Sequence, residues 1–347
     1  MKRVLFLCLM LMVISFSNAQ KKFSVYGIGF YNLENLFDYI HDEGKNDYEF
    51  LPDGTYKWNE MKYTHKLQNM SRVLSEMGTD VLPNVGCAVI GVSEVENARC
   101  LTDLVSQPAL KARNFQFTHI EGPDERGVDC ALLYNPSLFK VENINLFPYK
   151  YELPSDSAQH TRGFLTVSGK LAGDNVAFIV CHWPSRWSGS FYRETAGKQV
   201  RSIKDSILQA SPSTKVFVMG DLNDDPTNKS LTDALGAKGD IEAVKDGEMF
   251  NPWYDVLTKL GTGTLRYDGK WNLFDQIVVT ANAIQQKGKK DFDSLKYWKC
   301  QVFQRDYLFQ TEGKYKGNPK RTTAGGVWLN GYSDHLPVVV YMMKEQK

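Results

Sequence analysis

The sequence carries almost no excess of charge of either sign, with 41 Lys and Arg against 40 Asp and Glu in 347 residues. Strong nonspecific binding to nucleic acid depends on a surplus of basic side chains, so the overall charge gives no indication of it. The chain also lacks internal repeats and any linker-like shift in composition. Its hydrophobic content of 42% is typical of a soluble globular enzyme.

Cysteine is scarce as well, because the chain has six and no two of them have the spacing of zinc ligands. Five follow the first twenty residues: Cys87, Cys100, Cys130, Cys181 and Cys300. This odd number leaves at least one free thiol. Cys130 and Cys181 lie in strand-like runs, where they are expected to pack as small hydrophobes. A dense disulfide framework is not expected.

A long apolar run occurs near the start of the chain, from Val4 to Phe16. It follows Lys2-Arg3 and precedes Ser17-Asn18-Ala19, an arrangement that predicts a secretory signal peptide over residues 1–19. The run is shorter than the roughly 20 residues that span a bilayer, and no later stretch is long enough, so no stable membrane anchor is expected. The mature chain is therefore predicted to be exported, to the periplasm or outside the cell.

Short runs rich in β-branched and aromatic residues predict strands through most of the chain. They cover Val25–Tyr31, Val85–Val92, Phe115–Ile120, Cys130–Tyr134, Phe164–Ser168, Val176–Cys181, Val216–Met219, Phe274–Val279 and Val338–Met342. Apolar residues at helical spacing predict helices from Leu67 to Met77, from Leu101 to Val105 and from Ala196 to Ile207. Since strands and helices are intermixed, residues 20–347 are expected to form one α/β or α+β domain.

Two segments show little periodicity. His41 to Thr55 is rich in Gly, Asp and Lys, and we expect a surface loop there. Ala281 to Leu329 is rich in Lys, Gly and aromatic residues. It is expected to be either a long functional excursion or poorly ordered surface.

One strand-end motif contains the residue types that a metal-dependent site needs. The run Val216–Met219 stops at Gly220, which opens the polar segment Asp221-Leu222-Asn223. Open α/β sheets tend to bind ligands at the carboxyl ends of their strands, where these side chains would lie. An Asp can ligate a hard cation or act on a water molecule, and an Asn can donate to a phosphate oxygen. The same sequence is also an ordinary turn.

Similar polar groups stand at the ends of other predicted strands. They are Asn32 with Glu34, Glu94 with Glu96, His182, Asp275, and Ser333-Asp334-His335-Leu336-Pro337. Together with Gly220-Asp221-x-Asn223, this ordered series resembles the endonuclease/exonuclease/phosphatase family over most of the mature chain. The resemblance implies a four-layer sandwich of two packed, mainly antiparallel sheets flanked by helices. It also implies a metal-dependent phosphoric ester hydrolase.

The resemblance assigns three residues to the metal. Glu94 is the main metal carboxylate, Asn32 stands beside it, and Asp334 is a further metal-side carboxylate. Mg²⁺ is the expected ion, since it takes few protein ligands and keeps several waters, with Mn²⁺ or Ca²⁺ as alternatives. Taken singly, Glu94 could instead be a solvated strand-end carboxylate, and Asp334 a turn acid before Pro337.

The resemblance also implies five catalytic residues. His335 would be the base or transition-state partner, with Asp275 fixing its tautomer through the other ring nitrogen. Asp221 would align or deprotonate the attacking water, and Asn223 would hold a non-bridging phosphate oxygen. His182 would donate to the phosphate as charge builds. Taken singly, His335 could be a packed histidine and His182 a turn filler.

Three arginines are predicted to bind substrate. Arg162 resembles a family arginine near the substrate phosphate, with a surface ion pair as the alternative. Arg186 and Arg193 belong to a basic and aromatic segment after His182. Its other members are Trp183, Trp187, Tyr192, Lys198, Arg201 and Lys204. Such a segment suits a polynucleotide strand, and the alternative is the solvated face of a helix.

The sequence departs from two branches of the family. No Arg follows the Gly-Asp-x-Asn motif and no Cys precedes Asp275, which disfavours the inositol-phosphatase branch. Tyr31-Asn32 and Ser93-Glu94 differ from the Trp-Asn and Gln-Glu pairs of abasic-site enzymes.

An exported nuclease acting on DNA or RNA is the favoured function. An exported phospholipid phosphodiesterase or phosphatase is the alternative. A lipid enzyme would favour an exposed apolar hairpin, and the sequence shows no plain candidate for one, although Trp253, Trp271 and Trp298 keep the option open. A non-catalytic binding protein with the same fold is a third possibility.

Overall fold

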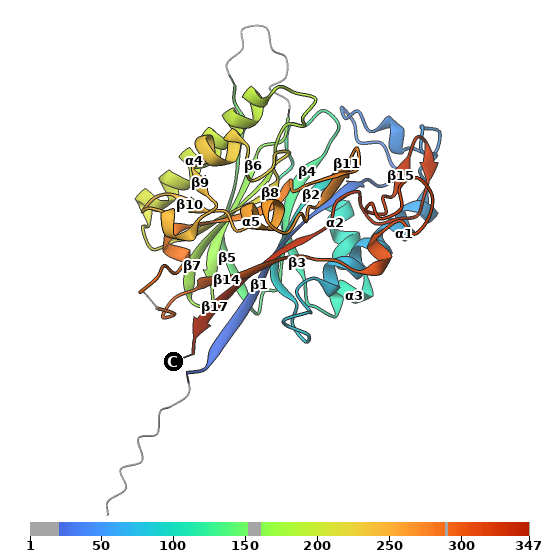
Figure 1. Cartoon of the computed structure of the whole chain (residues 1–347). Helices are drawn as coiled ribbons and strands as arrows, with labels where there is room; N and C mark the ends of the chain where they lie inside the picture. The colour runs from blue at the N-terminus through green and yellow to red at the C-terminus, as the bar shows by residue number, and fades with distance from the viewer. Residues whose placement is uncertain (1–20, 152–160, 289–290, 347) are drawn as a thin grey trace, which may run out of the picture.

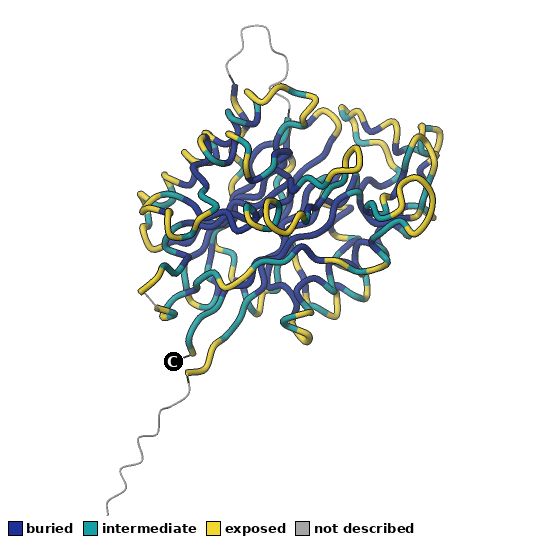
Figure 2. Tube along the Cα trace, in the orientation of Figure 1, coloured by how far each residue is buried: buried dark blue, intermediate teal, exposed yellow. Residues whose placement is uncertain are grey.

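The computed structural model describes residues 21–151, 161–288 and 291–346, so the predicted signal peptide lies outside the described residues. Two β-sheets pack together at the centre, and helices cover their outer faces (Figure 1). The central strands are the most continuously buried part of the chain, whereas the connecting loops carry much of the exposed surface (Figure 2). The predicted sandwich is confirmed.

The first sheet has six strands in the order β14–β17–β1–β2–β4–β3. Their bounds are β1 Phe23–Leu36, β2 Cys87–Val95, β3 Gln116–His119, β4 Asp129–Tyr134, β14 Lys296–Val302 and β17 Val338–Glu345. Neighbouring strands are antiparallel except for β1 and β2, which run parallel. The first and last of these strands in the chain are partners, with Phe30 opposite Val338.

The second sheet has seven strands in the order β5–β6–β7–β8–β13–β10–β9. Their bounds are β5 Phe139–Phe147, β6 Phe164–Leu171, β7 Asp174–His182, β8 Lys215–Asp221, β9 Ala237–Lys238, β10 Met249–Phe250 and β13 Asp275–Thr280. Its parallel pairs are β7–β8 and β9–β10. Two small hairpins join β11 Leu265–Tyr267 to β12 Lys270–Asn272, and β15 Thr323–Ala324 to β16 Val327–Trp328.

Helices complete the outer layers. The α-helices are α1 Glu60–Glu76, α2 Ala98–Val105, α3 Pro108–Lys111, α4 Ser190–Ala210 and α5 Trp253–Thr258. Shorter helical turns are η1 Tyr48–Phe50, η2 Ser230–Leu235, η3 Ile241–Ala243, η4 Ala281–Ala283 and η5 Asp306–Leu308. On α4, Ala196 and Val200 pack with Ile179 and Val218 of the second sheet. The helix predicted from Leu67 to Met77 is α1.

The two sheets can approach each other closely because a small residue of one sheet faces a large side chain of the other, as Gly91 faces Met219. Phe178 and Met219 of the second sheet share one buried core with Phe30 and Ile90 of the first. At Gly91 an added Cβ would lie 2.5 Å from the Sδ atom of Met219, closer than real Cβ atoms come. Close packing of this kind holds the strand ends of both sheets in fixed relative positions.

The structure corrects several details of the sequence predictions. Strands β5 and β14 were not predicted, and β14 shows that part of the segment from 281 to 329 is regular structure. The segment from 41 to 55 is more than a surface loop, because Asp47 and Phe50 are buried in it. Phe50 stacks on Phe37 with ring centroids 4.4 Å apart.

All five cysteines among the described residues are free, and Cys300 is the one that is not fully buried. This agrees with the prediction that no dense disulfide framework forms. Among the described residues, none of the helices combines the length and the apolarity that crossing a bilayer requires.

Candidate active site

Polar side chains from both sheets meet at one edge of the sandwich. Asn32 and Glu94 lie near the ends of the parallel strands β1 and β2. In the second sheet, Asp221 ends β8 beside His182 of β7 and opposite Asp275, the first residue of β13. The strand register therefore brings together residues that are far apart in the sequence.

Three backbone features aim these side chains into one space. Glu94 and Asn223 have φ angles of 61° and 50°, in the left-handed region that L residues rarely adopt. Such positions cost of order 1–3 kcal/mol each and cluster at functional sites. At Gly220 an added Cβ would lie 2.2 Å from the carbonyl oxygen of Cys181, so the Gly allows the close approach of β7 and β8.

Asn32 links the two acidic residues at the centre of the site. Its Nδ2 donates to Glu94 Oε1 at 3.1 Å and to Asp221 Oδ2 at 3.0 Å. Its Oδ1 accepts from the backbone N–H of Glu34 at 2.9 Å, which fixes the orientation of the amide. Glu94 also accepts from the N–H of Asn35 at 2.9 Å. Hydrogen bonds from the Asn32 amide and the Asn35 N–H therefore fix the Glu94 and Asp221 carboxylates before any ligand binds.

His335 and Asp275 form a buried ion pair, with His335 Nδ1 2.7 Å from Asp275 Oδ2. Burial alone would lower the pKa of His335, but the charges of Asp275 and Asp221 outweigh it and raise this pKa well above its ordinary value. The ring is therefore held as an imidazolium. Its Nε2 lies 3.7 Å from Asp221 Oδ2 and faces the same space.

Burial raises the pKa of Asp221 to about 7, against the opposing effect of the His335 charge. Asp221 Oδ1 accepts from the N–H of Asn223 at 3.0 Å. The Asn223 side chain donates through Nδ2 to the carbonyl of Trp183 at 2.9 Å. A carboxylate with this pKa can accept a proton near neutral pH.

His182 is the second imidazole of the site and differs from His335 in charge. Burial, followed by the charges of Arg162 and Arg126, lowers the pKa of His182 well below its ordinary value. Its Nε2 lies 3.8 Å from Glu94 Oε1 and 3.7 Å from Asp221 Oδ2. A neutral imidazole here can donate one hydrogen bond without adding positive charge.

Asp334, the residue before His335, is held by an ion pair with Arg321. Its Oδ2 accepts from Arg321 at 3.1 Å, and its Oδ1 lies 4.0 Å from His335 Nε2. Arg321 also donates to Glu34, which accepts in addition from the N–H of Thr322 at 2.6 Å. The sequence did not indicate an active-site role for Arg321. It lies in a segment without periodicity, and the basic residues of that segment do not by themselves point to a site.

The predicted substrate arginines occupy three different environments. Arg162 faces the site, where it donates to Asp124 Oδ2 at 3.2 Å and to the carbonyl of Trp183 at 3.4 Å. Arg193 is only 5% exposed, and its Nε lies 2.9 Å from Asp224 Oδ2. This position does not fit the prediction that Arg193 binds substrate, because its guanidinium is used inside the protein.

Two other basic residues of the predicted segment, Arg186 and Lys204, also make contacts within the protein. Arg186 donates to the carbonyl of Asn223 at 3.2 Å and to Asp225 at 2.9 Å, and its guanidinium lies over the Phe274 ring at 4.4 Å. Lys204 is 1% exposed and donates to a backbone carbonyl. Arg186 and Arg193 therefore support the loop that follows Asp221, whereas Lys198 and Arg201 of α4 are exposed.

A hollow of about 820 Å³ is lined by Glu94, His182, Asp221, Asn223, His335 and Arg162, among other residues. Its deep end is formed by Glu94, Asp221 and His335, and its outer part by residues such as Arg126 and Trp187. Trp187 is 99% exposed at this rim. Arg126 was another residue that sequence reasoning did not assign to the site.

The donor set fits a divalent metal ion. Ligand atoms of Glu94, His182 and Asp221 lie within 4.8 Å of one another. Those of Asp221, Asp275 and His335 lie equally close, but the imidazolium of His335 has no lone pair for a metal, so this second group is an ion-pair cluster. Asp334 belongs to neither group, so its predicted metal role stays a prediction. In the described part of the chain, the Oδ1 atom of Asp275 is buried without a hydrogen-bond partner. The site thus offers hard oxygen ligands and spare acceptor capacity.

A two-sheet sandwich with carboxylates, amides and two imidazoles converging at its strand ends defines a phosphoesterase class of protein. The chain belongs to the Endonuclease/Exonuclease/phosphatase family, whose family model matches residues 27–344. Members of this family are phosphoesterase hydrolases. Among curated proteins, no sequence matches the chain significantly.

Solved structures share this fold at low sequence identity. An endonuclease/exonuclease/phosphatase family protein from Bacteroides thetaiotaomicron has 15% identity and a TM-score of 0.56, over 94% of this chain and 97% of that one. The mannosyl-6-phosphatase of Bacteroides thetaiotaomicron has 15% identity and a TM-score of 0.56, over 91% and 99%. D. rerio TDP2 complexed with a single-strand DNA product has 14% identity and a TM-score of 0.52, over 92% and 99%.

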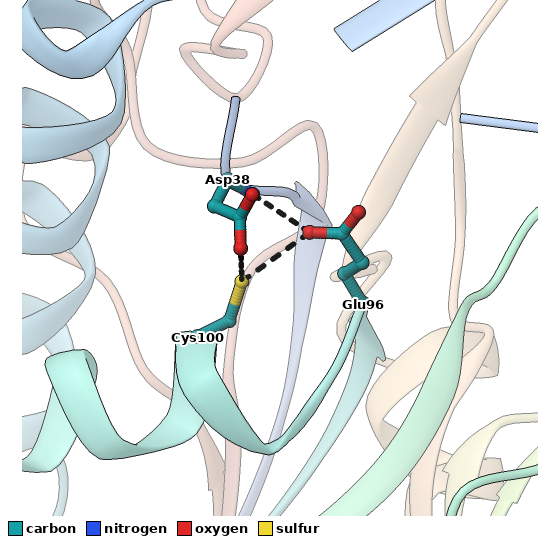
Figure 3. Close-up of side chains that lie close together, drawn as sticks. All are labelled: Asp38, Glu96 and Cys100. Atoms are coloured by element: carbon teal, nitrogen blue, oxygen red, sulfur yellow. Dashed lines mark hydrogen bonds between the residues drawn. The ribbon is translucent and has the colours of Figure 1, made fainter. Parts of the chain in front are cut away.

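A second acidic cluster lies beside the site and is satisfied by the protein itself. The side chains of Asp38, Glu96 and Cys100 point toward one another (Figure 3). Glu96 accepts from the N–H of Asp38 at 2.8 Å and from the Cys100 thiol at 3.5 Å. Asp38 is paired with Arg99. These bonds fix the start of α2 against the chain that follows β1.

Replacing Glu96 with Gln is expected to stabilise the fold at alkaline pH. Burial raises the pKa of Glu96 from 4.5 to about 8. The carboxyl therefore contributes stability that is fully present below about pH 4.5 and is lost as the pH rises through about 8. The loss is on the order of a few kcal/mol. Urea unfolding at pH 5 and pH 9 should show a smaller decline for Glu96→Gln than for the wild type.

Glu142, an exposed glutamate of β5, provides the matched control. Glu142→Gln should follow the wild-type pH dependence. If Glu96→Gln also declines as steeply as the wild type, then Glu96 is not protonated in the folded protein.

Proposed function

We propose that this protein is an exported, divalent-metal-dependent phosphodiesterase that cleaves nucleic acid through attack of water on phosphorus. The observation that carries the proposal is the hydrogen-bonded set of Asn32, Glu94 and Asp221 next to the His335–Asp275 ion pair. Export is supported by the signal-like sequence of residues 1–19. Membership of a family of phosphoesterases supports the reaction class.

The environments of the ionisable groups suggest separate roles for them. Asp221, with a pKa of about 7, accepts the proton of the attacking water. His335, held as an imidazolium by Asp275, donates to a phosphate oxygen as negative charge develops. Pairs of groups whose environments push their pKa values apart are typical of acid–base assignments.

Other residues bind and orient the phosphate. His182, held neutral, donates from Nε2, and Asn223 holds a non-bridging oxygen through its amide. Glu94 and Asn32 would hold the divalent cation, which would supply Lewis-acid stabilisation of charge on the phosphate. Arg162, at the wall of the hollow, adds a positive charge near the place where the phosphate binds.

A phospholipid substrate is the second candidate, and one observation favours it. Trp187 stands 99% exposed at the rim of the hollow, where an apolar side chain could enter a lipid surface. Trp253, one of the tryptophans considered from sequence, is buried and cannot do so.

Hydrolysis is expected to depend entirely on a divalent ion. The purified mature protein should cleave DNA or RNA and a chromogenic phosphodiester, lose both activities with a chelator, and regain them with Mg²⁺ or Mn²⁺. Sphingomyelin is assayed in parallel. Full activity after thorough chelation would refute the metal-dependent mechanism, and cleavage of sphingomyelin alone would establish the lipid alternative.

A further inference from the structure

A second hollow of about 640 Å³ has Asp334, the neighbour of His335 in the sequence, in its lining. Asp334 and Arg321 belong to its lining, and His335, the next residue, lines the first hollow. The two hollows therefore meet at the Asp334–His335 pair. A phosphomonoester or a small diester would need only one of them.

The β11–β12 hairpin forms one wall of the second hollow and is attached to the active site. Leu265 of β11 bridges to His335, and the N–H of Leu336 donates to the carbonyl of Thr264 at 2.8 Å. The same Thr264 accepts through its hydroxyl from the N–H of Asp275 at 3.3 Å. A ligand bound against this hairpin is thus held at a fixed position relative to the His335–Asp275 pair.

The opposite wall is the segment from Gln310 to Pro319. It is closed on itself by the hydrogen bonds of Gln310 N–H to Asn318 and of Gly317 N–H to Gln310, both 2.8 Å. An added Cβ at Gly317 would lie 3.4 Å from Arg266 Nη1, so the two walls face each other closely. The second hollow is therefore a channel between the β11–β12 hairpin and the segment from Gln310 to Pro319.

The lining combines positive charge with exposed aromatic rings. Arg266, Lys314, Lys316 and Arg321 outnumber the two acidic residues of the lining, Asp268 and Asp334.

Tyr267 on the hairpin is 73% exposed, and Tyr315 on the opposite segment is 59% exposed. Large aromatic rings with this exposure are not contributing to the core. Basic groups that contact phosphates, next to rings that stack on bases, are the combination that binds single-stranded nucleic acid.

We propose that the second hollow is a substrate subsite for the nucleotides flanking the scissile phosphate in a single-stranded polynucleotide. Lys314 and Lys316 contact a neighbouring phosphate, and Tyr267 and Tyr315 stack on unpaired bases. The inference rests on the proposed nuclease function and specifies its substrate. It also places the polynucleotide contacts in the second hollow instead of the segment from Arg186 to Lys204, where the sequence suggested them.

The test uses the mature protein and two double variants, Lys314→Ala with Lys316→Ala and Tyr267→Ala with Tyr315→Ala. All four side chains are exposed, so the fold should be retained. Lys111→Ala with Lys245→Ala removes the same charge from exposed positions that line neither hollow. Binding of a fluorescein-labelled single-stranded oligonucleotide is measured by anisotropy against salt, together with KM for the oligonucleotide and for bis(p-nitrophenyl) phosphate.

The tyrosine variant should raise Kd and KM for the oligonucleotide by roughly tenfold or more, since each stacked base contributes strongly to binding. The lysine variant should lower the slope of log Kd against log salt by about 1.4, or roughly 0.7 for each lost phosphate contact. Hydrolysis of bis(p-nitrophenyl) phosphate should be unchanged in both. The control variant should behave as the wild type throughout.

Three results would overturn the subsite. The first is unchanged oligonucleotide binding in both variants, and the second is an equal loss of oligonucleotide and bis(p-nitrophenyl) phosphate hydrolysis. The third is weaker binding to anionic phospholipid vesicles with oligonucleotide binding retained. A wild type that hydrolyses bis(p-nitrophenyl) phosphate but binds no oligonucleotide would refute the subsite while leaving the phosphodiesterase activity intact. If neither substrate is cleaved, the proposed function fails, and the anisotropy measurement still decides the subsite.

Discussion

Alanine in place of His335 is expected to lower kcat for a phosphodiester by roughly 10²–10⁴. The ring carries a positive charge because Asp275 and Asp221 flank it, and the Ala side chain has neither the charge nor a hydrogen-bond donor. The loss should appear mainly in kcat, since the charge acts most strongly on the transition state. Steady-state kinetics on DNA and on a chromogenic diester measure it.

The pH profile gives a second readout for the same variant. The His335 charge opposes the rise in the pKa of Asp221, so removing the ring should move that pKa above about 7. The residual activity of His335→Ala should therefore increase at higher pH than that of the wild type. His65→Ala, which removes a partly buried histidine packed on Trp328, is the control. Near-normal turnover by folded His335→Ala would show that its role is misassigned.

Replacing Glu94 with Gln should be nearly as damaging, for a different reason. The substitution keeps the shape of the side chain but removes a negative charge from the group of Glu94, His182 and Asp221. The metal ion contributes several kcal/mol to stabilising charge in such reactions, so the rate should fall by roughly 10²–10⁴ at a metal concentration that saturates the wild type. The Mg²⁺ concentration for half-maximal activity should also rise.

Glu96→Gln is the matched control, because it makes the same change at another mostly buried glutamate two positions along. It should retain activity and the wild-type metal requirement. If Glu94→Gln shows an unaltered Mg²⁺ titration, then Glu94 does not bind the metal.

Most of the long buried strands could be predicted from the sequence, whereas the edge strands β5 and β14 could not. Strands β5 and β14 are the outermost strands at one end of each sheet. Most residues of β5 are exposed, and Lys296–Val302 is buried fully only at its end. An edge strand has a partner on one side and less apolar cover, so its sequence lacks the hydrophobic run that marks a central strand.

The polar residues of the site could be found because each stands at the end of a recognisable strand. Their charges and distances could not be predicted, since those depend on neighbours such as Arg321 that come from irregular segments. The same limit applies to the basic residues of α4. The spacing of Arg193 and Lys204 places two basic residues on a helix. It does not show that Arg193 forms an ion pair with Asp224 or that Lys204 forms one with Asp205.

The pairing of β1 with β17 has a consequence for the timing of synthesis. Strand β17 fits between β1 and β14, and Ser333, just before it, donates to the carbonyl of Asn32, 301 residues earlier in the chain. Since the ribosome makes the amino end first, Asn32 is synthesised long before Ser333 and His335. A nascent chain without its last strand would carry no complete site. Such a chain would have no phosphoesterase activity until its translation is finished.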